Sequence, residues 1–158
     1  MTITLRPMQE AEFPAYRDYF IVDYAEEIAA NFGYTREKSQ AIAAQELTDD
    51  LPQTVNTPDH VLLCIERNDQ ETIGYLWYKL LDQETSVFIL DFVIFAPHRG
   101  QGYGQASLLV LQEHLAELGV EQIKLRVAFT NKRALGLYEK IGFRITGYNM
   151  VKELPQLL

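Results

Sequence analysis

The chain alternates between segments whose apolar residues recur every three or four positions and segments in which they alternate or run together. The first pattern predicts helices over residues 10–33, 35–51, 103–119 and 131–142. The second predicts strands over residues 3–8, 61–67, 72–81, 86–95 and 121–129, with one more strand or a hairpin over 143–154. This order of elements predicts an α/β or α+β domain with a mixed sheet of six to seven strands.

Residues with strong positional preferences stand at the predicted helix ends. Thr35 and Asn131 precede helical segments, where a side-chain oxygen can accept a hydrogen bond from an early backbone N–H. Gly33, Gly119 and Gly142 follow helical segments, where a left-handed backbone conformation ends a helix at little cost. These residues fix the expected boundaries.

Composition places the chain among ordinary globular proteins and predicts a single domain, residues 1–158. Its one cysteine, Cys64, has no partner for an internal disulfide, and no cluster with metal-ligand spacing is present. The start lacks the pattern of a signal peptide, and no apolar run approaches the roughly 20 residues that span a bilayer. We therefore expect a cytoplasmic protein without a metal and without a membrane partner.

The net charge of −8 argues against general binding to nucleic acid, which needs a basic surface. The charge is uneven, because residues 1–97 contain 6 Lys and Arg against 17 Asp and Glu, whereas residues 98–158 contain 8 against 5. This division suits a protein that holds a cation in its first half and a phosphate-bearing anion in its second. Two solvated surfaces would explain it equally well.

The segment HRGQGYG, residues 98–104, follows a predicted strand and opens a predicted helix. It matches neither G-x-G-x-x-G nor a Walker A loop, but it contains R-x-x-G-x-G from Arg99 to Gly104. The first amides of a helix lack partners within the helix, and glycines let them close around phosphate oxygens. The alternative is a tight connection between strand and helix.

Two motifs together, FVIFAPHRGQGYGQASL and NKRALGLYEKIGF, resemble the acetyl-CoA-binding core of the GNAT superfamily of N-acetyltransferases. They stand in the family's order, and the segments NTPDH, IGYLWY and LDFVI further resemble a bacterial subgroup of unassigned substrate. The resemblance implies a mostly antiparallel sheet with one splayed strand pair and about four helices. It also implies that acetyl-CoA is the co-substrate.

The resemblance also implies positions for the donor. The backbone of Phe92, Val93 and Ile94 would bond the pantetheine arm, and an N–H of Val93 or Ile94 would face the thioester carbonyl. Pyrophosphate would lie against the loop, and Asn131 and Ala134 would contact the pantetheine. The implied loop residues are Arg99, Gly100, Gln101, Gly102, Tyr103 and Gly104.

Tyr138 shares a helix face with Asn131 and Ala134, and the resemblance places its hydroxyl near the sulfur as a catalytic acid. The alternatives are a core aromatic at Tyr138 and a simple N-cap at Asn131.

Asp91 is the candidate general base, because it is the only acid in the apolar strand SVFILDFVIF. An ammonium acceptor must lose a proton before it attacks, and a buried carboxylate with a raised pKa can accept it. The alternative is a structural role in bonding loop amides. Strict strand alternation puts Asp91 and Val93 on one face, with Leu90, Phe92 and Ile94 on the other.

The early helices form the acceptor wall in the family, so Glu26 and Glu27 are candidates to line it, unless they belong to a solvated face. We expect direct acetyl transfer from acetyl-CoA to a primary amine of a small molecule or a protein, and the acidic first half favours a cationic acceptor. A non-catalytic acyl-CoA-binding or regulatory module and a different nucleotide-phosphate-binding protein are the alternatives. Edge strands would also allow a homodimer.

Overall fold

The computed structural model describes residues 2–68, 70–81, 83 and 85–157. The chain divides into two compact units, Met1–Arg126 and Val127–Leu158. The first unit contains the sheet and the glycine loop, and the second contains the NKRALGLYEKIGF motif.

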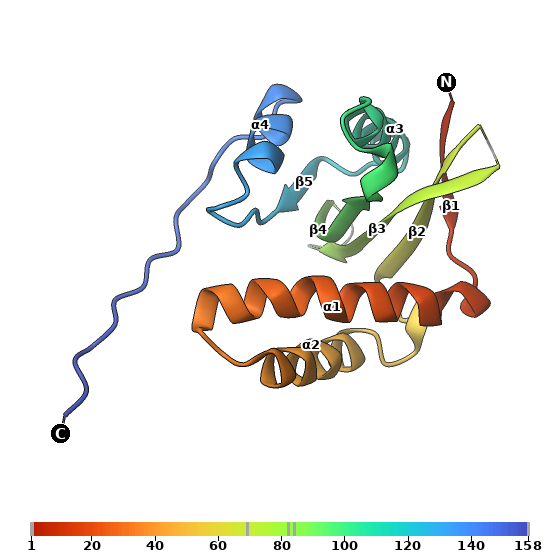
Figure 1. The fold of residues 1–158 in the computed structure, drawn as a ribbon. Helices are drawn as coiled ribbons and strands as arrows, with labels where there is room; N and C mark the ends of the chain where they lie inside the picture. The colour runs from red at the N-terminus through yellow and green to blue at the C-terminus, as the bar shows by residue number, and fades with distance from the viewer. Residues whose placement is uncertain (1, 69, 82, 84, 158) are drawn as a thin grey trace. The chain divides into compact units, whose positions relative to one another are not determined.

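The sheet of the first unit has the strand order β1-β2-β3-β4-β5 (Figure 1). Neighbours are antiparallel from β1 to β4, and the last pair, β4 and β5, is parallel, so the expected mixed sheet is confirmed. The strands are β1 (Ile3–Pro7), β2 (His60–Arg67), β3 (Glu71–Leu81), β4 (Ser86–Ile94) and β5 (Gln122–Leu125).

Two helices cover one face of this sheet and one covers the other (Figure 1). A short 3-10 turn, Glu10–Glu12, leads into α1 (Phe13–Phe32), and α2 (Arg36–Asp50) packs beside α1. On the opposite face lies α3 (Tyr103–Glu117). The predicted ends are confirmed, because Gly33 is left-handed at the end of α1 and the Thr35 hydroxyl accepts from the Lys38 N–H.

The aromatic row of α1 packs against the sheet, as its helical spacing predicts. Tyr16 and Phe20 are buried, and the Phe20 ring meets the Trp77 ring of β3 edge-on at 5.5 Å between centroids. Tyr16 also meets Tyr75 edge-on at 5.0 Å. Edge-to-face pairs add about 0.5–1.5 kcal/mol beyond the area that they bury. The core thus holds α1 rigidly over β3 and β4.

The expectation of six to seven strands is wrong, because the described residues form five. The strand predicted over 121–129 ends at Leu125, and described residues 143–157 contain neither helix nor strand. Alternating apolar residues form a strand only when a neighbouring strand supplies the ladder of hydrogen bonds. Without that ladder Tyr148, Met150 and Val151 are exposed.

The second unit contains α4 (Lys132–Lys140). Its start is fixed as predicted, since the Asn131 side chain accepts a hydrogen bond from the Ala134 N–H at 3.2 Å. Gly142 follows the helix with a φ of 107°. Within the described ranges, no helix is long and apolar enough to cross a bilayer.

Candidate active site

A β-bulge in β4 sets the direction of the candidate base. Asp91 pairs with Trp77, but the next pair along the ladder joins Ile89 to Tyr78, so Leu90 is an extra residue in β4. Such a residue breaks the alternation of faces. Leu90 consequently packs in the same cluster as Trp77, on the side of α1. The prediction that Leu90 lies opposite Asp91 is therefore wrong.

The Asp91 carboxylate lies under α1 between two tyrosines. The Tyr16 hydroxyl donates to Asp91 Oδ2 at 2.8 Å, and the Tyr19 hydroxyl donates to Oδ1 at 3.4 Å. Tyr16 itself is fully buried, so its hydroxyl needs a partner in the protein. These contacts fix the orientation of the carboxylate.

Burial raises the pKa of the Asp91 carboxyl from 3.8 to about 7, and the negative charge of Asp23 acts in the same direction. Hydrogen bonds from Tyr16, Tyr19 and the Phe92 backbone lower the pKa, but burial outweighs them. A carboxyl with this pKa is partly ionised at neutral pH. It can therefore accept a proton near pH 7 and release it again.

Further acids lie along α1 beyond Tyr19. Burial raises the pKa of the Asp23 carboxyl, with added repulsion from Glu26 and Glu27. The Arg99 guanidinium and a hydrogen bond from Tyr19 partly oppose that rise in pKa. Glu27 forms an ion pair of 3.3 Å with Arg126, which directly follows β5. The carboxyl ends of β4 and β5 therefore adjoin an acidic stretch of α1.

The pairing of β4 with β5 covers only the first part of β4. It joins Ser86–Ile89 to Gln122–Leu125 and stops at the bulge, whereas β4 continues to Ile94. The N–H of Phe95 donates to the Ile73 carbonyl of β3. Because backbone directions alternate along an antiparallel strand, the N–H and C=O of Val93 also point to β3. Those of Phe92 and Ile94 consequently point to the side of β5, into the space where pairing has ended.

The glycine loop adopts the conformations that its glycines allow. Gly100 and Gly102 have φ values of 77° and 85°, and Gly102 directly precedes α3. Gly104 lies within the first turn of the helix and is not left-handed. The first backbone N–H groups of α3 therefore stand at the end of the loop, and the partial positive charge there suits an anion.

Three side chains of the loop bond to the protein itself. Arg99 Nε donates to the Ile94 carbonyl oxygen at 2.7 Å, and the buried Tyr103 ring directs its hydroxyl to Arg67 Nη1 at 3.0 Å. Gln101 Nε2 donates to the Pro97 carbonyl at 3.4 Å. The groups best placed for phosphate are therefore the backbone amides, while roles for these side chains stay predictions.

The predicted residues of the second unit share one face of α4. Asn131 is exposed at the N-cap, Ala134 and Tyr138 are partly buried, and the Tyr138 ring meets Phe143 at 5.6 Å between centroids. The N-cap role of Asn131 is confirmed. Contact of Asn131, Ala134 and Tyr138 with the donor stays a prediction.

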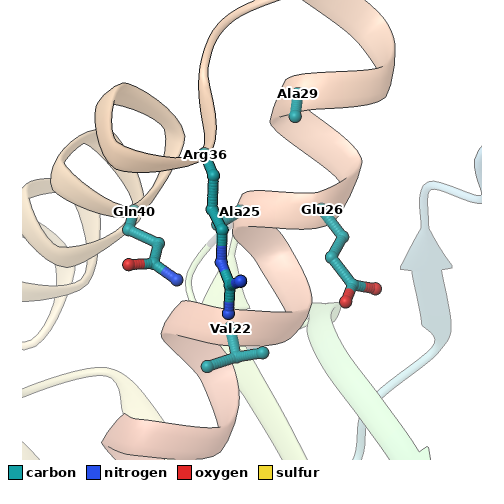
Figure 2. Close-up of a pocket in the computed structure, with 6 residues that line it drawn as sticks. All are labelled: Val22, Ala25, Glu26, Ala29, Arg36 and Gln40. Atoms are coloured by element: carbon teal, nitrogen blue, oxygen red, sulfur yellow. The ribbon is translucent and has the colours of Figure 1, made fainter.

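A pocket of about 400 Å³ lies between α1 and α2, and Figure 2 shows residues that line it. At about 100° per residue, Ala25 and Ala29 lie on the side of α1 away from Tyr16, whereas Glu26 follows Tyr19 by seven residues and lies close to its face. Arg36 and Gln40 extend into it from α2 (Figure 2). The lining consists of Val22, Ala25, Glu26, Ala29, Arg36 and Gln40. Glu26 thus faces this pocket, and its place in an acceptor wall stays a prediction.

Sequence patterns did not identify the tyrosines or Asp23 as parts of the site. The row Tyr16, Phe20 and Tyr24 has core spacing, and packing is its main role. One signal was available, because a buried helix position held by Tyr instead of Phe needs a partner for its hydroxyl. An acid in the strand opposite, Asp91, supplies such a partner.

Comparison with known proteins identifies the family of the chain. Residues 21–143 match the Acetyltransferase (GNAT) family. The chain is 35% identical over 156 residues to the uncharacterized N-acetyltransferase YycN of Bacillus subtilis, covering 98% of this chain and 100% of the relative. The crystal structure of YycN superposes with a TM-score of 0.91 at 34% identity, with the same coverage of 98% and 100%.

More distant structures share the fold. The PaiA N-acetyltransferase of Thermoplasma acidophilum, crystallised with coenzyme A, is 16% identical with a TM-score of 0.70 over 94% of each chain. The family match and the likeness to YycN confirm the expectation of a GNAT-like fold and of an acyltransferase. The chain belongs to the GNAT family of acetyltransferases, whose members use acetyl-CoA.

Proposed function

We propose that this enzyme transfers an acetyl group from acetyl-CoA directly to a primary amine. The observation that supports it most is the place of Asp91, a carboxyl with a pKa of about 7 beside the end of β4 where pairing with β5 has stopped. A proton acceptor and strand backbone that is not paired with β5 thus occur within a few residues of each other.

The donor binds along the open side of β4 and at the start of α3. Backbone groups of Phe92 bond the pantetheine amides as a neighbouring strand would, while the Ile94 carbonyl already accepts from Arg99. The Ile94 N–H, instead of that of Val93, faces the thioester carbonyl, because Val93 directs its backbone to β3. Amides at Gly102–Gly104 bind the pyrophosphate.

Asp91 takes the proton of the attacking amine. A lysine-like amine has a pKa near 10.4, so freeing its lone pair at pH 7 costs roughly 4–5 kcal/mol. With the proton on Asp91, nitrogen attacks the thioester carbonyl carbon, and the N–C bond forms as the C–S bond breaks. Asp91 releases this proton to solvent and then accepts the second proton, which the nitrogen loses as the amide forms.

Tyr138 supplies the proton that the departing sulfur needs. A phenol with a pKa near 10 stays protonated at neutral pH and can donate to a thiolate. Tyr138 then recovers its proton from solvent, so the ammonium loses two protons overall, of which CoA gains one and solvent gains one. The motif around Tyr138 and its place on the face of Asn131 support this assignment.

The acceptor carries positive charge. The first 97 residues have a net charge of −11, and Asp23 and Glu27 on α1 adjoin the ends of β4 and β5. Carboxylates in that position attract an ammonium group and disfavour an anionic acceptor.

A screen of amines for acceptor-dependent release of the CoA thiol tests the proposal. We expect turnover with amines that carry a second positive charge, and a kcat/KM that falls as ionic strength rises because salt screens the attraction. Release without any dependence on the amine, or a neutral or anionic compound as the best acceptor, would contradict the proposal.

A further inference from the structure

The two ends of the glycine loop are tied to the same place on the sheet. At its end, the hydroxyl of Tyr103 accepts a hydrogen bond from Arg67 Nη1 at 3.0 Å. At its start, His98 Nε2 lies 3.2 Å from Glu71 Oε1. Arg67 is the last residue of β2 and Glu71 is the first of β3.

One carboxylate joins these two contacts. Glu71 Oε2 accepts from Arg67 Nη2 at 2.6 Å while its other oxygen faces His98. The His98 and Tyr103 rings are also in edge-on contact, with 6.3 Å between centroids. Residues 99–102 therefore lie between His98 and Tyr103, and both of these side chains contact the same ion pair of Arg67 and Glu71.

These contacts reduce the free energy that ordering a glycine-rich loop would cost on binding. Glycines lose more conformational freedom on ordering than other residues, and Gly100 and Gly102 both hold left-handed conformations. If the loop were mobile before binding, part of the binding free energy would be lost in ordering it. Tyr103 is buried and His98 nearly so, which makes both suitable anchors.

We infer that Arg67 and Glu71 are positioning residues that hold the phosphate-binding loop in its binding conformation before the donor arrives. They act through His98 and Tyr103 and do not touch the phosphates themselves. The inference rests on the proposed binding of acetyl-CoA at this loop. It assigns a function to the β2–β3 hairpin end, which the proposed chemistry does not otherwise use.

Titration calorimetry with coenzyme A, combined with steady-state kinetics, tests the inference. Glu71→Ala removes the contact with His98 and the ion pair that holds Arg67 beneath Tyr103, so we expect the Kd of coenzyme A and the KM of acetyl-CoA to rise about tenfold. The kcat at saturating acetyl-CoA should stay within about twofold, since Glu71 is remote from the proposed proton transfers. A merely destabilised fold would lower Tm without this division between KM and kcat.

Two further variants make the test specific. Tyr103→Phe removes only a hydroxyl and keeps the buried ring, so it should raise the Kd less than Glu71→Ala and add little to it in the double variant. The matched control is Glu66→Ala, at the residue of β2 next to Arg67. It breaks the 3.0 Å ion pair between Glu66 and Arg6 of β1 and should leave the Kd of coenzyme A unchanged.

The outcomes separate this inference from the proposed function. A wild-type chain that binds coenzyme A, with Glu71→Ala binding equally well, overturns the inference alone. An equal rise in Kd for Glu66→Ala also overturns it. A wild-type chain that binds no coenzyme A overturns the proposed function and the inference together.

Discussion

The hydroxyl of Tyr16 donates a hydrogen bond to Asp91 Oδ2 over 2.8 Å, linking the first helix to the bulged strand. The contact joins residues that are 75 positions apart in sequence. Burial raises the pKa of Tyr16, so its phenol stays protonated at neutral pH. The carboxyl of Asp91 beside it can ionise there. The properties of Asp91 therefore depend on α1.

Tyr16→Phe should shift the titration of Asp91 upward. The Tyr16 hydrogen bond favours the ionised carboxylate, and its loss raises the pKa of Asp91 further above about 7. The limb of kcat/KM that rises with pH should move to higher pH in the variant. Tyr24→Phe, at a tyrosine that bonds Glu46 instead, is the control and should leave the limb in place.

Asp91→Asn should make stability less dependent on pH. The folded pKa of Asp91, about 7, lies above its ordinary value of 3.8, so the folded state resists ionisation. The contribution of Asp91 to stability is thus fully present below pH 4 and is lost as the pH rises through 7. The loss is about 4 kcal/mol at 1.36 kcal/mol per pKa unit.

Urea unfolding at pH 4 and pH 8 measures this difference. The free energy of unfolding should fall more between these pH values in the wild type than in Asp91→Asn. The same fall in both proteins would show that Asp91 ionises freely in the folded state.

Gly74→Ala should displace the part of β4 that is proposed to bind the donor. A Cβ atom on Gly74 would overlap the Val93 carbonyl oxygen and come within 3.2 Å of the Ile94 Cα atom. We expect a loss of about 1–3 kcal/mol in the free energy of unfolding and weaker binding of coenzyme A. Denaturant unfolding and calorimetry measure the two effects.

Gly136→Ala provides the contrast. Gly136 lies within α4, and a Cβ atom there meets nothing within 4 Å. Alanine should stabilise the helix by about 0.5–1 kcal/mol. If Gly136→Ala destabilised the protein as much as Gly74→Ala, the overlap of the Gly74 Cβ atom with Val93 of β4 would not be the cause of the lost stability.

Tyr138→Phe should lower kcat by about 10²–10⁴, the usual contribution of a general acid, with the affinity for acetyl-CoA nearly unchanged. Only the hydroxyl is removed, and the ring can keep its contact with Phe143. Single-turnover kinetics isolates the chemical step. Wild-type rates in that experiment would assign Tyr138 to packing.

Local signals in the sequence predicted much of the fold. Thr35 and Asn131 cap helices as expected, and Gly33 and Gly142 end them, because each such residue acts through bonds to its own neighbours. The segment over 143–154 shows the limit, since its strand pattern requires a partner strand that no local pattern supplies. The expected count of six to seven strands was wrong because this segment forms no strand.

The candidate site shows the same limit. Asp91 stood out as a lone acid in an apolar strand, but its pKa depends on Tyr16 and Tyr19 from a distant segment. The bulge at Leu90 belongs to the pairing of β4 with β3, so neither strand alone reveals it. The tie between Arg67 and Tyr103 likewise arises only when the hairpin and the loop meet.

The pH dependence of acceptor-dependent thiol release in wild type and Asp91→Asn tests the central claim most directly. With one cationic amine and saturating acetyl-CoA, the wild type should show a limb near pH 7, set by ionisation of Asp91. Asp91→Asn should lose that limb and about 10²–10⁴ in kcat/KM for the amine, while coenzyme A binding persists. An Asn variant with wild-type kcat/KM and the same limb would contradict the assignment of Asp91 as the base.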